Sequence, residues 1–484
     1  MTVAIADIKH RRSAVVTDTP TNGGRLGTTV IVTARNNILP RVTQAERTAG
    51  ITRYRKTFLL NHNAANEVAN DFLFYFIINS TSDDRIYFGM GHNNDTQASW
   101  VASGAEYPHW QSAGQLDSDI TAGASSVDIV MENNDIELPP GGYLYISDKF
   151  MTGQTIAGDV SMGNSVELVG GTWVRRDYVD DVEYPYGYYM GSNTVYTSNT
   201  GMNEEYPRIA EDKTTDEVLG TGNGTTTPTV ADFGNVTNGL NFKGVYVDSR
   251  QGGWLAMKPR LGITVGGTPT TLYFDADGYL QGATAGRINM DTGVWITAPT
   301  FTSAPDGGTD ITATYWDKPY SFAGNVMTVN LADTVANNYT AANSFAGGCI
   351  NVSELKAMSR DWSETSASGT YDEATYPVVT EAYGTIYDSW TIEFTSSTAF
   401  TCTGTNTGSV GTGTISSDFG PVNPDTSTPY FTIDMLGWGG SWTTGDQVTF
   451  VTEPAALGVV WKEVVPAATA AYSNNLVIFG LYWE

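Results

Sequence analysis

The chain has 484 residues, of which only 16% are charged and 12% are aromatic, and it contains 52 glycines. This composition is typical of many short strands joined by glycine-rich turns, and it excludes a helical bundle or a largely disordered chain. The formal net charge of −27 repels phosphate, so we expect no nucleic-acid binding by the acidic body of the protein. We predict an all-β fold of several antiparallel β-sandwich or barrel-like domains, with an extended N-terminal arm and very few short helices.

Residues 1–56 form a basic segment that differs from the rest of the chain. The first 60 residues carry ten Lys or Arg and three acidic residues, a net charge of +7, whereas the remainder has a net charge of −34. Residues 1–40 show no sustained hydrophobic period, which predicts an extended arm that becomes ordered on a neighbouring subunit. A capping box, Thr43-Gln-Ala-Glu46, followed by a stop at Gly50, predicts one short helix in this segment.

The charge contrast identifies the expected partner of the basic segment. Because the body is acidic, a sister subunit attracts this segment more directly than nucleic acid does, and copies of the chain are therefore expected to associate. We take the arginines of the segment as candidate interface residues: Arg11, Arg12, Arg41, Arg47, Arg53 and Arg55.

Short apolar runs separated by polar turns occupy residues 57–149. They predict strands at 57–60, 72–78, 86–90, 122–130 and 141–149. Further along, a dense aromatic cluster follows the acidic run at 177–183. If it is exposed, it offers a platform for sugar rings or for another protein, and if it is buried, it belongs to a core. Its candidate interface residues are Tyr184, Tyr186, Tyr188 and Tyr189.

Alternation of apolar and polar residues is clearest near the C-terminus. Trp390, Ile392 and Phe394 alternate with polar residues, and so do Val448 and Phe450. Successive side chains of a strand point to opposite faces, so each apolar set lies on one buried face. We predict a compact C-terminal β domain at 381–484, preceded by a connection at 351–380. The apolar run at 475–483 is expected to be a closing strand.

The sequence contains no spacing typical of a nucleophilic triad or a zinc site. The four histidines, His10, His62, His92 and His109, lie far from such patterns. The segment Asp275-Ala-Asp-Gly278 resembles the start of a calcium loop but lacks the later ligands, so we predict a hairpin turn. Cys349 and Cys402 are expected to be small buried side chains. We predict no catalytic, cofactor-binding or metal site, and no enzyme.

Several motifs resemble those of tailed-bacteriophage virion proteins. In the C-terminal part, they are Ser416-Ser-Asp-Phe-Gly-Pro421, Gly437-Trp-Gly-Gly440 and Trp461-Lys-Glu-Val-Val-Pro466. Residues 37–56 resemble the entry sequence of the same proteins, and the resemblance covers 36–149 and 321–484. It implies a first β domain made of 57–149 and 321–350. An inserted β domain at 150–320 interrupts it and resembles a small β module of phage structural proteins.

The resemblance also implies a function. It indicates a structural component of the tail, baseplate or neck, which acts through contacts with copies of itself and other virion proteins. The alternative is a carbohydrate-binding adhesin whose partner is a glycan of the host surface. No signal-peptide pattern opens the chain, and the apolar run at 72–78 is too short for a bilayer. We therefore expect synthesis in the host cytoplasm, no membrane insertion and a final location in the virion.

Overall fold

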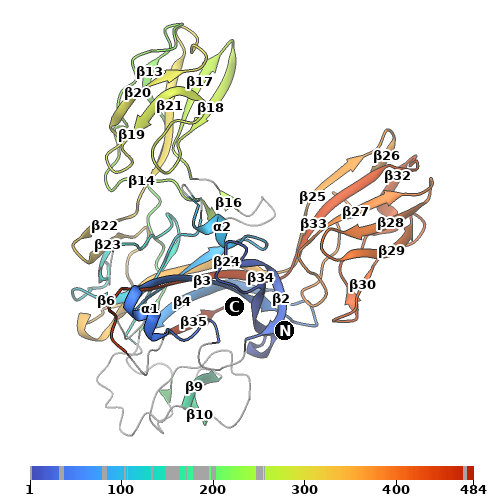
Figure 1. Ribbon diagram of the computed structural model, residues 1–484, viewed down its shortest axis with the longest axis horizontal. Helices are drawn as coiled ribbons and strands as arrows, with labels where there is room; N and C mark the ends of the chain where they lie inside the picture. Colours follow the sequence, from blue (N-terminus) through green and yellow to red (C-terminus); the bar gives the residue numbers. More distant parts are fainter. Residues whose placement is uncertain are drawn as a thin grey trace.

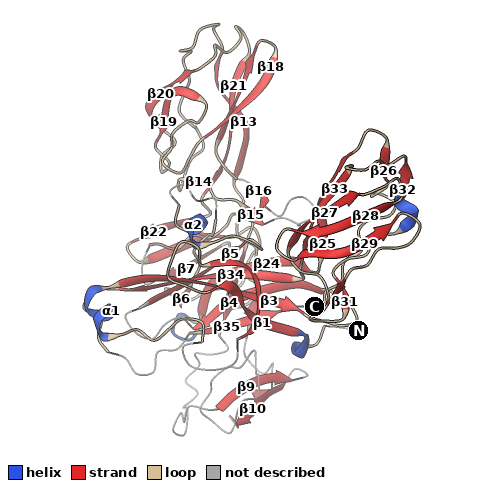
Figure 2. Cartoon of the chain, turned by 45° about the vertical axis from the view of Figure 1, so that its right-hand side comes forward, coloured by secondary structure: helices blue, strands red, loops and turns tan. Residues whose placement is uncertain are grey.

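The computed structural model describes residues 3–31, 37–78, 84–102, 105, 107–131, 134–148, 164–169, 172–177, 196–197, 203–246, 254–255, 257–471 and 477–483. About half of this part of the chain is in strands, which pair antiparallel, and only a small fraction is helical, which confirms the all-β prediction. A central body carries two β lobes that point away from it in different directions (Figure 1, Figure 2). We call residues 213–317 the inserted lobe and residues 358–453 the C-terminal lobe.

The first sheet of the body brings the two ends of the chain together. Its strand order is β2-β1-β3-β34-β5, and β34 pairs with β3 over ten residue pairs and with β5 over seven. Segments about 400 positions apart in sequence therefore share one hydrogen-bonded unit. The strands are β1 Ile8–Val15, β2 Gly23–Val30, β3 Ile51–Asn61, β5 Arg85–Gly91 and β34 Ala456–Val465.

The second sheet of the body has nine strands. Its main path is β12-β8-β24-β6-β7-β23-β22, while β4 pairs with β24 and β35 pairs with β4. Its strands are β4 Ala69–Ile78, β6 Ala113–Leu116, β7 Ser126–Val130, β8 Tyr143–Ser147, β12 Glu204–Glu205, β22 Tyr320–Ala323, β23 Val326–Asn330, β24 Phe345–Leu355 and β35 Ile478–Tyr482.

Strand β4 shows how the two sheets form a sandwich. Phe74 and Phe76 point into the core shared with the first sheet, where Phe74 meets Trp461 edge-on with 5.7 Å between ring centroids. Tyr75 points to the opposite face and stacks on Tyr145 at 4.1 Å. Truncating one buried Phe or Trp to Ala typically costs about 3–5 kcal/mol, so this aromatic core holds the two sheets together.

The inserted lobe has its own core. A sheet of order β13-β21-β17-β18, with β14 on β21, packs with the hairpin β19–β20, and Phe233 stacks on Tyr315 at 4.8 Å. Its strands are β13 Lys213–Thr221, β14 Leu240–Asn241, β17 Arg260–Val265, β18 Thr268–Tyr273, β19 Ala283–Ile288, β20 Trp295–Phe301 and β21 Asp310–Asp317. Smaller sheets contain β9 Asn164–Val169, β10 Thr172–Asp177 and β11 Tyr196–Thr197, and β15 Val245–Tyr246 with β16 Trp254–Leu255.

The C-terminal lobe is organised by the predicted alternation. Trp390, Ile392 and Phe394 are fully buried in its core, and Val448 and Phe450 pack with them. The sheet order is β25-β33-β27-β28-β29. The strands are β25 Met358–Thr365, β26 Gly369–Tyr371, β27 Asp388–Phe394, β28 Ala399–Gly404, β29 Gly408–Thr414, β30 Val422–Asn423, β31 Thr428–Pro429, β32 Trp438–Gly440 and β33 Gln447–Glu453.

Strand pairing divides the chain differently from the predicted domains. The segment predicted as one insertion at 150–320 returns to the body midway, because β12 pairs with β8 and Ile209 is fully buried in the body core. The segment predicted as the C-terminal domain, 381–484, leaves the lobe after β33, since β34 and β35 pair within the body. The predicted connection at 351–380 contains β25, which is a lobe strand.

The N-terminal segment is extended, and its strands pair within this chain. Strand β1 pairs with β2 and β3 of the same sheet. The predicted capping box is present at α1 Gln44–Ala49, with reciprocal hydrogen bonds between Thr43 and Glu46, and the helix ends at Gly50. The second helix is α2 Gln97–Trp100, and 3₁₀ turns occupy Ile5–Asp7, Ala341–Asn343 and Met435–Gly437.

These boundaries predict which deletion the body tolerates. Replacing 213–317 with a short Gly/Ser linker should leave the body folded, because Lys213 and Trp316 pair directly across the base of the lobe. Replacing 150–320 should destabilise the body by about 3 kcal/mol or more, since it also removes buried Ile209 and a body strand. Thermal unfolding of both variants, followed by circular dichroism, checks this. Equal melting temperatures would contradict it.

Candidate functional site

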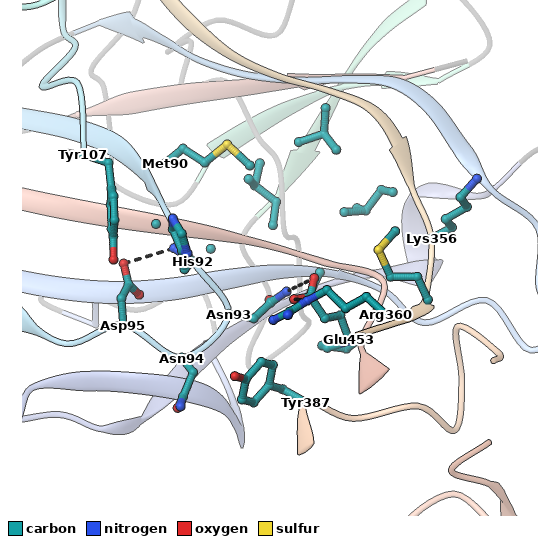
Figure 3. A pocket seen from close by; sticks show the side chains of 18 of the residues that line it. Met90, His92, Asn93, Asn94, Asp95, Tyr107, Lys356, Arg360, Tyr387 and Glu453 are labelled. Carbon is teal, nitrogen blue, oxygen red and sulfur yellow. Dashed lines mark hydrogen bonds and ion pairs between the residues drawn. The ribbon is translucent and has the colours of Figure 1, made fainter. Parts of the chain in front are cut away.

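A hollow lies where the C-terminal lobe joins the body. The chain crosses this junction twice, after β24 and before β34, and a cavity of about 290 Å³ opens beside the crossings (Figure 3). Its lining comes from both parts. Residues 358, 360, 387 and 453 belong to the C-terminal lobe, and residues 90–95, 99, 107, 352, 354–356, 454 and 456–458 belong to the body and the two crossings. A site built from both units is sensitive to their relative position.

An ion pair spans the lobe side of the cavity. Arg360 Nε donates to Glu453 Oε1 at 2.8 Å, and Asn93 Nδ2 donates to Glu453 Oε2 at 3.0 Å (Figure 3). Lys356 pairs with Glu354 nearby. Glu453 therefore connects Asn93 in the body loop to Arg360 in the first strand of the lobe. On this side of the cavity, the two positive charges, Arg360 and Lys356, are each paired with a carboxylate.

Further polar and aromatic contacts fix the lobe against the body. The backbone N–H of Ala382 donates to Asn66 Oδ1 at 2.7 Å, and the rings of His62 and Tyr383 lie 4.2 Å apart. Burial lowers the pKa of His62 to about 4, and the neighbouring cation Arg11 adds to this. His62 is therefore neutral at pH 7, which suits a ring-on-ring contact.

Next to the cavity lies the buried ion pair of Lys56 and Asp95, which could not be recognised from the sequence. Lys56 Nζ contacts Asp95 Oδ1, and both side chains are enclosed by protein. The available signal was weak: Lys56 follows Arg53 and Arg55 and directly precedes the apolar run at 57–60, so it could be taken as one more cation of the basic segment. The partner, 39 positions away, could not be read from spacing.

The arginines proposed as an interface have separate environments. Arg53 and Arg55 are buried and used inside the chain: Arg53 Nη2 pairs with Glu46 at 2.6 Å, and Arg55 Nη1 with Asp18 at 2.7 Å. Half-buried Arg12 donates to the backbone oxygen of Asn37 at 2.8 Å. Arg11 and Arg47 are also half-buried, and Arg41 is exposed. Tyr184, Tyr186, Tyr188 and Tyr189 lie outside the described residues.

The histidines and cysteines do not form a reactive cluster. Burial lowers the pKa of His10 and of His109 to about 3, and His92 stacks on Tyr107 at 4.2 Å. Cys349 and Cys402 are buried, as predicted. Within the described ranges, no group of three His, Cys, Asp or Glu side chains is arranged to hold a metal ion. None of the described helices is long and apolar enough to cross a membrane.

Comparison with family models, with curated proteins and with solved structures finds no match for this chain. The site is therefore interpreted from its own chemistry. Amide groups of Asn93 and Asn94, the Arg360–Glu453 pair and the ring of Tyr387 face one hollow, with apolar Met90 beside them (Figure 3). Such a lining can orient a small polar ligand through hydrogen bonds and hold its less polar face against a ring.

A buried carboxyl on β34 predicts a pH dependence of stability. Burial raises the pKa of Glu463 to about 7, and its partner Arg53, 3.3 Å away and shared with Glu46, only partly opposes this. The folded state therefore binds a proton that the unfolded chain has released. The resulting stabilisation is present below pH 4.5 and is lost as the pH rises through 7.

The contribution of Glu463 to this pH dependence is obtained by comparing the wild type with Glu463→Gln. The difference between their unfolding free energies should vary with pH between 4.5 and 7, by at most about 1.4 kcal/mol per pH unit. Urea unfolding at several pH values measures it. A difference that stays constant across this window would contradict the raised pKa.

Proposed function

We propose that this protein is a structural component of a tailed-phage particle, in the tail, baseplate or neck, and that it acts through contacts between subunits. The proposal starts from the resemblance of its motifs to phage virion proteins. These motifs occupy structural positions, because Trp461 lies in the body core and Phe419 in the core of the C-terminal lobe. Copies of the chain and other virion proteins are the proposed partners, and the particle is the proposed location.

One observation of the C-terminal lobe carries the proposal. Four large apolar side chains are strongly exposed on adjacent segments of it: Val379 51%, Val422 60%, Met435 40% and Leu436 62%. The segments are neighbours, since Val379 bridges to Thr432 and Val422 pairs with Pro429. Single exposed apolar residues are ordinary, but several on neighbouring segments are what a protein–protein contact would bury. We call these four residues the lobe apolar set.

The test is assembly of phage that carries Val422→Asp together with Leu436→Asp. We expect the variant protein to fold and its incorporation into purified particles to fall at least tenfold, because burying two unpaired carboxylates in a contact is strongly unfavourable. The matched control adds the same charge on the same lobe at Ser409 and Thr412, both exposed on β29. Absence of the wild-type chain from purified particles would reject the proposal. Normal incorporation of the Val422/Leu436 variant would reject the role of the lobe apolar set.

A host-surface carbohydrate adhesin is the second candidate function, favoured by the cavity at the lobe junction. Asn93, Asn94 and Tyr387 combine amide groups with an aromatic ring, a combination that suits sugars. Binding of the purified protein to host polysaccharide, lost in Tyr387→Ala, would support this function. A protein that is present in fixed copy number in the particle and binds no glycan would support the structural role instead.

A further inference from the structure

Lys56 and Asp95 form an ion pair that is shut off from solvent. The Lys56 side chain is 0% exposed and that of Asp95 is 2% exposed, and Lys56 Nζ contacts Asp95 Oδ1. Lys56 lies in the middle of β3, whereas Asp95 lies in the loop between β5 and α2. Keeping two opposite charges this far from water is costly, because each loses its hydration and the attraction between them only partly compensates.

The Asp95 carboxylate is held by donors on its other oxygen. Trp100 Nε1 donates to Oδ2 at 2.7 Å, and the backbone N–H of His92 donates to the same atom at 3.0 Å. Two N–H groups on one oxygen stabilise the negative charge that develops there during attack on the adjoining carbon, as in an oxyanion hole. The Lys56 nitrogen therefore stands beside a polarised carboxyl carbon.

We propose that Lys56 and Asp95 condense to an isopeptide bond, so that this pair is a self-modification site. Lys56 Nζ first passes one proton to Asp95 Oδ1 and attacks Cγ as the neutral amine, so that charge collects on Oδ2 against Trp100 and His92; the nitrogen then passes a second proton to Oδ1. The tetrahedral intermediate then collapses and the Cγ–Oδ1 bond breaks. Overall, the ammonium group loses two protons, and both leave with Oδ1 as water. Ammonium and carboxylate thus become a neutral amide and one water, and no co-reactant is needed.

The surroundings of the pair favour this reaction. Burial lowers the pKa of Lys56, although Asp95 opposes the effect, and the neutral amine is the nucleophilic form. The Phe58 ring lies 4.8 Å from Nζ and adds an apolar wall. The amide N–H that remains has an acceptor in the backbone oxygen of His92, 2.6 Å from Nζ. Asp95 also lines the 290 Å³ cavity, which therefore lies next to the pair and has room for the released water.

A second Lys–carboxylate pair joins residues 213–317 to the body and provides a matched comparison. Lys243 Nζ contacts Glu137 Oε2, but these side chains are 10% and 30% exposed. The backbone N–H of Trp110 reaches the same Oε2 from 3.5 Å, a distance at which a hydrogen bond is weak. Lys243 and Glu137 are therefore expected to remain an ion pair in the same protein.

The bond would tie β3 to a loop that organises its surroundings. Asp95 O accepts a hydrogen bond from the backbone of Gly24 at 2.7 Å, and Gln97 N donates to Asn22 O at 2.7 Å. A covalent link between positions 56 and 95 closes a chain loop and restricts the unfolded state. The first sheet and the cavity floor would then resist unfolding together.

Intact mass spectrometry of the full-length chain in denaturant tests the proposal. The wild-type mass should be below the calculated mass by one water, about 18 Da, and Asp95→Ala should show no deficit. Asp95→Asn keeps the attacked carbon and releases ammonia, so its deficit should be about 17 Da. In a tryptic digest, a branched peptide should join Lys56 to Asp95, with no cleavage after Lys56 and normal cleavage after Lys243.

The decisive measurement is made on the wild type, so it stands even if a variant fails to fold. A wild-type mass equal to the calculated one, with efficient cleavage after Lys56, would show an ion pair only and overturn the proposal. A water deficit located at an aspartyl succinimide in a linear peptide would overturn it equally. A branched peptide through Lys243 would show that burial of the pair and the donors Trp100 and His92 do not determine which lysine reacts, and it would overturn the proposal.

Discussion

Truncation of the chain after Glu453 is expected to abolish folding of the central body. Strand β34 lies between β3 and β5, and it buries Leu457, Val459 and Trp461 on one face and Val460 on the other. Each of these side chains contributes about 1.5–3 kcal/mol through burial. Their sum matches the total stability of an ordinary domain, about 5–15 kcal/mol, before the lost strand pairing is counted.

The measurement is far-ultraviolet circular dichroism with thermal unfolding of residues 1–453 beside the full chain. We expect the truncated protein to lose the transition of the body while residues 358–453, made separately, keep a cooperative transition. This separate lobe is the control for nonspecific effects of cutting. If residues 1–453 unfold with the same midpoint and amplitude as the full chain, then β34 is not part of the body core and the division into a body and two lobes is wrong.

Local patterns in the sequence were enough to predict local structure. The alternation at 390–394 placed three side chains in a core, and the capping box at 43–46 placed a helix. The segment at 275–278 is the predicted turn: Gly278 has φ 79° and its N–H donates to Asp275 O at 3.0 Å. Each signal is complete within a few residues, because strand faces, caps and tight turns are decided by neighbours.

Long-range pairing could not be predicted in this way. The partner of β3 is about 400 positions away, and the period of β34 fits any buried strand, so the pattern could not distinguish the lobe from the body. The N-terminal segment has the same difficulty. Its weak hydrophobic pattern suggested an arm that becomes ordered on a neighbour. In the structure, backbone hydrogen bonds to β3 order β1, although few of its side chains are apolar.

The cavity where the C-terminal lobe joins the body is likewise formed by residues that are far apart in the sequence. The hydrogen bond from Asn93, in the loop after β5, to Glu453 joins positions 360 residues apart, which no local pattern reveals. Likewise, Arg53 and Arg55 looked like surface charges from composition alone. Their partners Glu463, Glu46 and Asp18 come from three separate segments, and only the fold brings them together.

Replacing Asp388 with Ala is expected to destabilise the C-terminal lobe by roughly 3 kcal/mol or more, because several donors together lose one shared acceptor that is fully buried. Asp388 is fully buried at the start of β27. Its Oδ1 accepts from the backbone of Asn406 at 2.9 Å, and its Oδ2 accepts from the backbone of Thr407 at 2.9 Å and its hydroxyl at 2.6 Å. The carboxylate thereby closes the turn between β28 and β29.

Thermal unfolding of the isolated lobe, residues 358–453, measures this effect, with a fall in the melting temperature on the order of 10 °C or more. Asp388→Asn should fall between the wild type and Asp388→Ala, since an amide keeps one acceptor oxygen but turns its NH₂ group toward the donors of one of the two residues. Asp425→Ala, which removes an exposed carboxylate from the same lobe, is the control and should shift the melting temperature by only a few degrees. An Asp388→Ala lobe as stable as this control would mean that water replaces the carboxylate as the acceptor for this turn, whose residues Thr405 and Asn406 are exposed.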